Sequence, residues 1–134
     1  MPILLGIVVA IHGLITIAIG AGTLNGGRPV STPGMNWYPV SLGQSWLLSD
    51  GAARIGSGLW ILAGVGLVLT ASALLGIVLP RTAWPVLGLG SAVVGLVALA
   101  LFFHPYYAIG ILANVAILGA ATVFRSNAKT LLGI

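Results

Sequence analysis

The chain has 134 residues, of which 59% are hydrophobic and only 4% are charged. Soluble domains carry about 25% charged residues, so this composition excludes a soluble globular domain. A lipid bilayer suits it instead, because a charge at the centre of a membrane helix costs roughly 2.5–3.5 kcal/mol. We therefore predict an all-α integral protein of the plasma or inner membrane, with a single membrane domain over residues 1–134.

Five basic residues stand against one acidic residue, Asp50, and the formal net charge is +4. In a soluble protein this imbalance would suggest nucleic-acid binding. Here the basic residues lie between or after apolar stretches, so they are better explained as signals for membrane orientation, and we expect no nucleic-acid partner. The chain has no cysteine, which excludes disulfides, thiolate metal sites and thiol redox relays.

The first apolar stretch covers residues 3–23. It ends in small residues, as a signal peptide does, but no Lys or Arg precedes it and it is longer than a usual signal core. We expect this segment to be retained as a membrane helix.

The segment 24–50 has a different composition, because glycines and prolines break any regular period within it. Its aromatic side chains Trp37, Tyr38 and Trp46 suit the headgroup layer, where an amphipathic ring has both wet and apolar neighbours. We expect a structured extracytoplasmic loop between the first two helices, whose contacts are made by these aromatic residues and by Asp50.

The later apolar stretches cover residues 51–79, 84–103 and 107–124. Each is near or above the roughly 17–25 residues that a helix needs to cross about 30 Å of hydrocarbon. The links between them are short and contain Pro80 and Pro105, so consecutive helices should be antiparallel neighbours. The predicted architecture is a four-transmembrane-helix antiparallel bundle.

Four spans would place both termini on one side of the membrane. That side would hold Arg81, Arg125 and Lys129, and the opposite side would hold Arg28, Arg54 and His104. Positive residues favour the cytoplasm. We therefore expect the N and C termini to be cytoplasmic and the long loop to be extracytoplasmic.

Most of the 20 glycines lie inside the predicted spans. Gly6, Gly13 and Gly20 recur every seven residues in the first span, and Gly88 and Gly95 share one face of the third. Small residues on one stripe let helix backbones approach closely in lipid. The pattern favours tight packing within the chain, and a seam between copies in a homo-oligomer is the alternative.

Few polar side chains fall within the spans. His12 lies near the middle of the first, and a rise of about 1.5 Å per residue places Asn114 of the fourth at a similar depth. Because polar groups in hydrocarbon must find partners, we expect these residues to converge inside the bundle. The candidate ligand-binding residues are His12, Arg54, Ser57, Trp60, Ser91 and Asn114.

One interpretation of this set is a pocket, open toward the extracytoplasmic leaflet, that binds a quinone, an isoprenoid or a lipid by its polar head. His12 or Asn114 would be the donor and Arg54 the charged anchor. In the alternative interpretation, His12 and Asn114 form an interhelical hydrogen bond worth about 1 kcal/mol. Arg54 would then reach the headgroups and Trp60 would belong to the core.

Several classes of membrane protein are excluded because the chain lacks the residues they need. A proton-coupled exporter of the small multidrug type needs a carboxylate within a span, and a vitamin K epoxide reductase needs paired cysteines. The two histidines, His12 and His104, lie at different depths without an accompanying carboxylate, so we expect no metal site. No nucleotide motif, nucleophilic serine elbow or pair of carboxylates occurs, so we predict no catalytic residue and no intrinsic cofactor.

Five short segments carry a likeness to a known family: Ile11-His12-Gly13-Leu14-Ile15, Ser45-Trp46, Gly51-Ala52-Ala53-Arg54-Ile55-Gly56, Trp84-Pro85 and Gly110-Ile111-Leu112-Ala113-Asn114. Through them the chain resembles the DoxX-like group of four-helix bacterial and archaeal membrane proteins. That group includes a small subunit of an archaeal thiosulfate:quinone oxidoreductase and a partner in a mycobacterial membrane oxidoreductase complex. The resemblance implies an accessory, quinone-adjacent role, although this chain lacks the cysteines and nearly all the acidic residues of better characterised members.

Three functions follow from these observations. The first is a small non-catalytic subunit of a larger electron-transfer complex in the membrane. The second is a stand-alone protein that binds a quinone or a lipid, or a DoxX-like oxidoreductase component. The third is a homo-oligomeric channel or transporter. The expected partners are membrane lipids and other membrane protein subunits.

Overall fold

The computed structural model describes residues 2–24, 50–102, 107–123 and 125–132. These ranges are helical apart from short turns, which confirms the all-α prediction. The helices are α1 (Pro2–Leu24), α2 (Asp50–Leu75), the short 3-10 helix η2 (Arg81–Ala83), α3 (Trp84–Leu101), α4 (Ala108–Ala121) and α5 (Arg125–Leu132).

Several predicted features lie outside the described residues. They are the loop 25–49 with Arg28, Trp37, Tyr38 and Trp46, the residue His104, and the side chains of Asp50 and Lys129. The predictions made for them therefore stay predictions.

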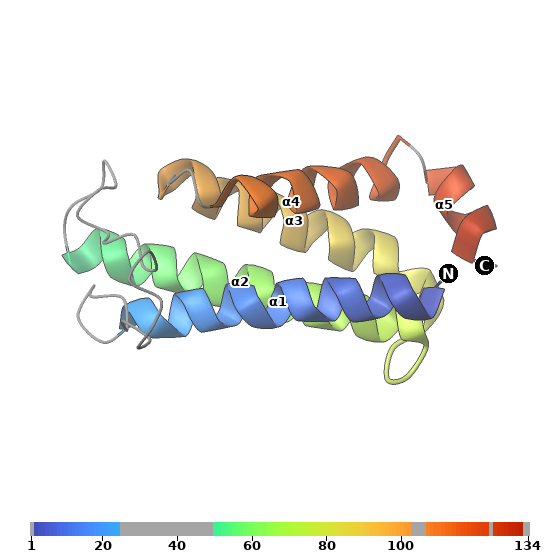
Figure 1. The fold of residues 1–134 in the computed structure, drawn as a ribbon, viewed down its shortest axis with the longest axis horizontal. Coiled ribbons are helices and arrows are strands. Elements are labelled where there is room, and N and C mark those ends of the chain that lie inside the picture. Colours follow the sequence, from blue (N-terminus) through green and yellow to red (C-terminus); the bar gives the residue numbers. More distant parts are fainter. Residues whose placement is uncertain (1, 25–49, 103–106, 124, 133–134) are drawn as a thin grey trace.

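Helices α1 to α4 lie alongside one another, and each packs on the helix that follows it in the chain (Figure 1). Helix α1 begins at the end of the molecule where α4 finishes and α5 lies. Three segments, Pro2–Gly22, Arg54–Leu75 and Arg81–Leu101, are long and apolar enough to cross a membrane, and α4 is a shorter apolar helix. The chain is thus a multi-pass membrane protein.

Helix α1 packs on α2 through glycine. A Cβ atom built on Gly13 would lie 2.9 Å from the carbonyl oxygen of Gly64, and one built on Gly64 would lie 2.7 Å from the carbonyl oxygen of Gly13. Gly6 and Gly20 also face α2, against Leu75 and the backbone of the Ser57 turn. The three glycines spaced seven residues apart therefore pack against α2 of the same chain, where they allow the two backbones to approach closely.

The second helix is shorter than predicted, because α2 ends at Leu75 rather than at residue 79. Gly76 follows with a φ of 67°, in the left-handed region that glycine enters freely. The Gly76 N–H donates to the carbonyl of Ala73 at 3.1 Å. The Ile77 N–H donates to the carbonyl of Ser72 at 3.2 Å, so the two bonds form a Schellman motif.

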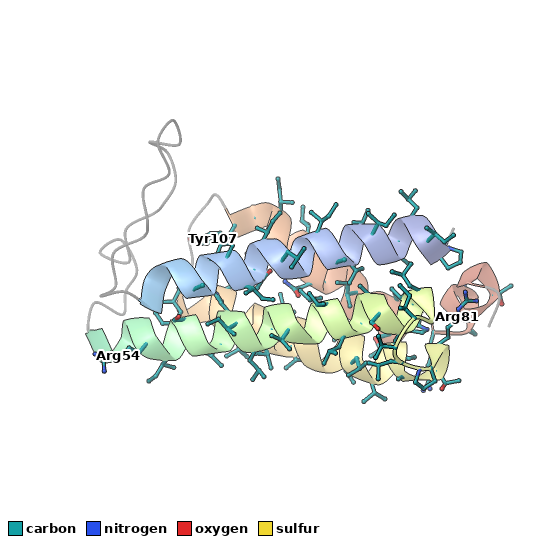
Figure 2. The ribbon with its side chains drawn as sticks, turned by 90° about the horizontal axis from the view of Figure 1, so that it is seen from below. Arg54, Arg81 and Tyr107 are labelled. Atoms are coloured by element: carbon teal, nitrogen blue, oxygen red, sulfur yellow. The ribbon has the colours of Figure 1, made fainter. Side chains whose placement is uncertain are left out.

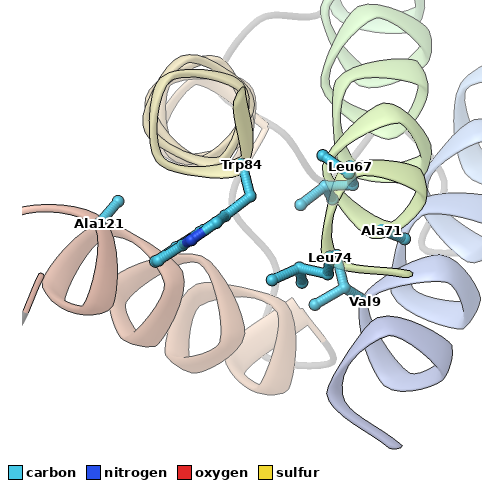
Figure 3. Packing of buried hydrophobic residues seen from close by; sticks show 7 residues of the cluster. Val9, Leu67, Ala71, Leu74, Trp84 and Ala121 are labelled. Atoms are coloured by element: carbon cyan, nitrogen blue, oxygen red, sulfur yellow. The ribbon is translucent and has the colours of Figure 1, made fainter. Parts of the chain in front are cut away.

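A tryptophan at the start of α3 fills the space between the helices at the end of the molecule where α1 begins. Trp84 projects from α3 toward α4, and Leu74 and Val9 of the α1–α2 pair lie on its other side (Figure 3). Pro85 follows it in the first turn of α3, where its missing N–H costs nothing. The buried cluster thus contains residues of all four long helices, with Ala121 contributed by α4.

The last predicted span contains one helix, which ends three residues before the predicted end at residue 124. Helix α4 covers Ala108–Ala121, within the predicted range 107–124, and the polar α5 turns away from it at the end of the bundle (Figure 1). Thr122 caps α4 with its N–H and its hydroxyl, which both donate to the carbonyl of Leu118. A helix of 14 residues is about 21 Å long, which is less than the hydrocarbon thickness of about 30 Å.

Candidate functional site

Two of the predicted site residues, from the first and the fourth long helices, meet inside the protein. The Asn114 Nδ2 atom lies 3.4 Å from the Nε2 atom of His12. Asn114 is only 3% exposed, whereas His12 is half-buried. Helices α1 and α4 do not pack closely along their backbones, and this pair is one of the side-chain contacts that join them.

The orientation of the Asn114 amide is determined by its own helix. Its Nδ2 atom lies 2.8 Å from the carbonyl oxygen of Gly110, a position that only a donor can occupy. The Oδ1 atom must then turn toward Gly95, where a Cβ atom would meet it at 2.9 Å. A side chain at residue 95 would therefore displace the Asn114 amide from this position.

The amide orientation in turn determines the tautomer of His12. The second hydrogen of Nδ2 points to His12 Nε2, so this nitrogen must accept, and the imidazole is neutral with its proton on Nδ1. The arrangement leaves Asn114 Oδ1 buried with no hydrogen-bond partner among the described residues. The site therefore has both an unused acceptor and, on the other side of the imidazole ring, an N–H donor.

The two predicted serines do not join this pair. Ser57 is buried in the α1–α2 contact, where its hydroxyl donates a hydrogen bond to the carbonyl of Gly20. Ser91 is buried against Gly66, and its hydroxyl donates to the carbonyl of Leu87 in its own helix at 2.7 Å. The structure brings together His12 and Asn114, whereas both serine hydroxyls donate to backbone carbonyls.

Arg54 is exposed at the start of α2, at the opposite end of the molecule from Arg81 (Figure 2). Trp60 is 5% exposed and forms an aromatic cluster with two residues that the sequence did not single out. Its ring centroid lies 5.1 Å from that of Tyr107 and 6.4 Å from that of Phe102, both in edge-on geometry. Trp60 thus ties α2 to the two ends of the α3–α4 link.

Sequence reasoning did not single out Thr70, and it named Trp84 only within the Trp84-Pro85 segment of the family resemblance. Thr70 is fully buried and donates to the carbonyl of Gly66 at 2.7 Å, a local bond within α2. Trp84 is buried in the core, and its Nε1 atom has no hydrogen-bond partner in the described part of the chain. Neither residue belongs to a chemical motif. For Trp84 the sequence offers one signal of a packing role, its position directly before a proline at the start of a span.

The described residues contain no group of three or more His, Cys, Asp or Glu side chains that could hold a metal ion. Comparisons with protein-family models, with curated proteins and with solved structures find no match for this chain.

Proposed function

We propose that this chain is a small non-catalytic membrane subunit that packs laterally against a larger electron-transfer complex of the respiratory or photosynthetic type. The observation that carries the proposal is the weak burial of α4. Only Asn114 and Ala121 are buried among the described residues of this helix. Ile109 and Leu112, one turn apart on its outer face, are 79% and 69% exposed.

The length of α4 supports a protein neighbour over lipid alone. A helix of about 21 Å is shorter than the surrounding hydrocarbon, and such mismatch is relieved by local thinning of the bilayer or by association with other helices. A neighbouring subunit would cover the outer face of α4 and satisfy the ends of the helix at the same time. In this proposal all four long helices cross the membrane.

The use of the buried hydroxyl groups also supports a structural role. Ser57, Thr70 and Ser91 each donate to a backbone carbonyl within the chain. Groups used in this way stabilise helices and helix contacts, and they are not poised for proton transfer or nucleophilic attack. The electron-transfer character of the complex rests on the DoxX-like resemblance alone.

The orientation belongs to the same proposal. Arg81 on η2 and Arg125 on α5 are exposed and lie toward the end of the molecule where α1 begins (Figures 1 and 2). Because basic residues favour the cytoplasmic side, this end faces the cytoplasm and the end with Arg54 faces outward.

Site-specific photocrosslinking in cells tests the proposal. A photoreactive amino acid at Ile109 or Leu112 should give a discrete protein adduct, and the same group at Leu62, which is 60% exposed on α2, serves as the matched control. The adduct from α4 should contain a protein that copurifies in fixed stoichiometry in mild detergent and carries a haem, flavin or iron–sulfur absorbance. A chain that migrates alone and crosslinks only to lipid from both helices would contradict the proposal.

A stand-alone protein that binds a quinone or a lipid is the second candidate, and the unused donor and acceptor of the His12–Asn114 pair favour it. No comparable observation favours a homo-oligomeric channel. Its motive was the glycine stripe, and Gly6, Gly13 and Gly20 are occupied by contacts with α2.

A further inference from the structure

The His12–Asn114 pair lies deep in the membrane-spanning part of the protein. His12 is ten residues from Pro2 and twelve from Leu24, so it lies about 15 Å and 18 Å from the two ends of α1. At this depth there is no bulk water to satisfy a polar group, and an unmet donor or acceptor costs several kcal/mol. A hydrogen-bond donor or acceptor that has no partner within the protein at this depth is therefore stabilised when a ligand provides one.

The unmet group that a ligand can reach is on His12. Asn114 Oδ1 is sealed against Gly95, whereas His12 is half-buried and its Nε2 atom is engaged with Asn114. The Nδ1–H group is then the free donor of the pair. No hydrogen bond joins it to any described residue.

The surroundings of the imidazole are apolar. A Cβ atom built on Gly110 would lie 3.9 Å from the Cε1 atom of His12 and 3.8 Å from the Cδ1 atom of Leu99, both at ordinary van der Waals distance, so a methyl group there would not clash with the ring. Ile11 and Ile15 beside His12 on α1 are each 53% exposed. A molecule that approaches from the lipid would meet hydrocarbon side chains first and one hydrogen-bond donor behind them.

We propose that the seam between α1 and α4 at His12 and Asn114 binds an apolar molecule with a carbonyl oxygen, which accepts the Nδ1–H hydrogen bond of His12. Asn114 is a positioning residue in this site, because it keeps the proton on Nδ1. The carbonyl can belong to a quinone or to the ester of a neutral glyceride, since both present the same acceptor on an apolar body. The proposal does not depend on a protein partner.

Native mass spectrometry of the full-length chain in detergent tests the binding. The probes are decylubiquinone and dioleoylglycerol, with hexadecane as a probe that lacks an acceptor. At least one carbonyl probe should bind saturably at one molecule per chain, and hexadecane should not. The probe that binds identifies the source of the carbonyl, and failure of both carbonyl probes to bind saturably would overturn the proposal.

Two substitutions of His12 separate the ring nitrogens. The amide nitrogen of His12→Asn takes the place of Nδ1, whereas that of His12→Gln takes the place of Nε2. We expect His12→Asn to keep binding within about threefold and His12→Gln to weaken it by about tenfold, the loss of one hydrogen bond of about 1.4 kcal/mol. Equal binding by His12→Gln and the unmodified chain would refute the role of Nδ1.

Nitrogen NMR of the unmodified chain, labelled at histidine, keeps the proposal testable should a variant fail to fold. The His12 signals should show a proton on Nδ1 and none on Nε2, and the carbonyl probe should shift the Nδ1 signal. A proton on Nε2, or an Nδ1 signal that ignores saturating probe, would overturn the proposal. Both measurements use the isolated chain, so a missing protein partner cannot be mistaken for a missing ligand.

Discussion

The contact between α1 and α2 depends on the absence of a side chain at Gly13. A methyl group there would lie 2.9 Å from the carbonyl oxygen of Gly64 and 3.0 Å from the Cβ atom of Leu67. Both are main-chain or near-main-chain atoms, which cannot move aside as the end of a flexible side chain can. Gly13→Ala should therefore force the two helices apart.

The magnitude follows from comparison with a glycine in open space. A Cβ atom on Gly58 of α2 would meet nothing within 4 Å. Both Gly→Ala changes gain the same intrinsic helix preference, about 0.8–1.0 kcal/mol, so the difference between the variants isolates packing. Overpacking costs about 1–3 kcal/mol, and we expect Gly13→Ala to be less stable than Gly58→Ala by that amount.

Reversible unfolding by SDS in mixed micelles, followed by circular dichroism, measures this difference. The reciprocal contact gives a further check, because a Cβ atom on Gly64 would lie 2.7 Å from the carbonyl oxygen of Gly13. The double variant Gly13→Ala/Gly64→Ala should cost less than the sum of the single changes, since the first methyl group already separates the helices. Unfolding free energies of Gly13→Ala and Gly58→Ala that agree within about 0.5 kcal/mol would refute this account of the contact.

Three other outcomes follow from single positions. Gly76→Ala should lower the unfolding free energy by about 1–2 kcal/mol because φ is 67° there, and Gly76→Asn should lower it less; equal effects in thermal unfolding would argue against the Schellman turn. Ser57→Ala should cost about 0.6 kcal/mol, with a range up to about 1.7, whereas the exposed Thr122→Ala should cost almost nothing in the SDS assay, and the reverse order would be inconsistent with an α1–α2 hydrogen bond. Ser126→Cys introduces a thiol into a chain that has none, and an impermeant maleimide should label it only from the cytoplasmic side; labelling from outside would invert the proposed orientation.

Composition and the spacing of apolar runs were enough to predict the solvent and the helical class. A chain with 4% charged residues can satisfy its surface only in lipid, and in lipid each backbone polar group must bond within its own helix. These constraints depend on the residue types along one segment, so the helices can be predicted without knowing which other helices they contact. They located α1 to within one residue at each end and α2 at its start.

The end of α2 needed geometry that composition does not record. Apolar residues continue to Leu79, but the helix ends at Leu75. Gly76 adopts a positive φ there and forms a Schellman turn. Helix α4 likewise ends at Ala121, three residues before the predicted end of its span, with Thr122 as its cap. A hydropathy pattern describes what a segment prefers as solvent and not where its backbone turns.

The identity of the polar partners was decided by tertiary structure. Depth along the helices placed His12, Asn114, Ser57 and Ser91 at comparable levels, yet helix rotation turns only the first two toward each other. The same rotation directs Gly13 to α2 rather than to a second copy of the chain. The position of a residue along a helix follows from its number in the sequence. The neighbour that its side chain faces depends on how the helices pack against one another.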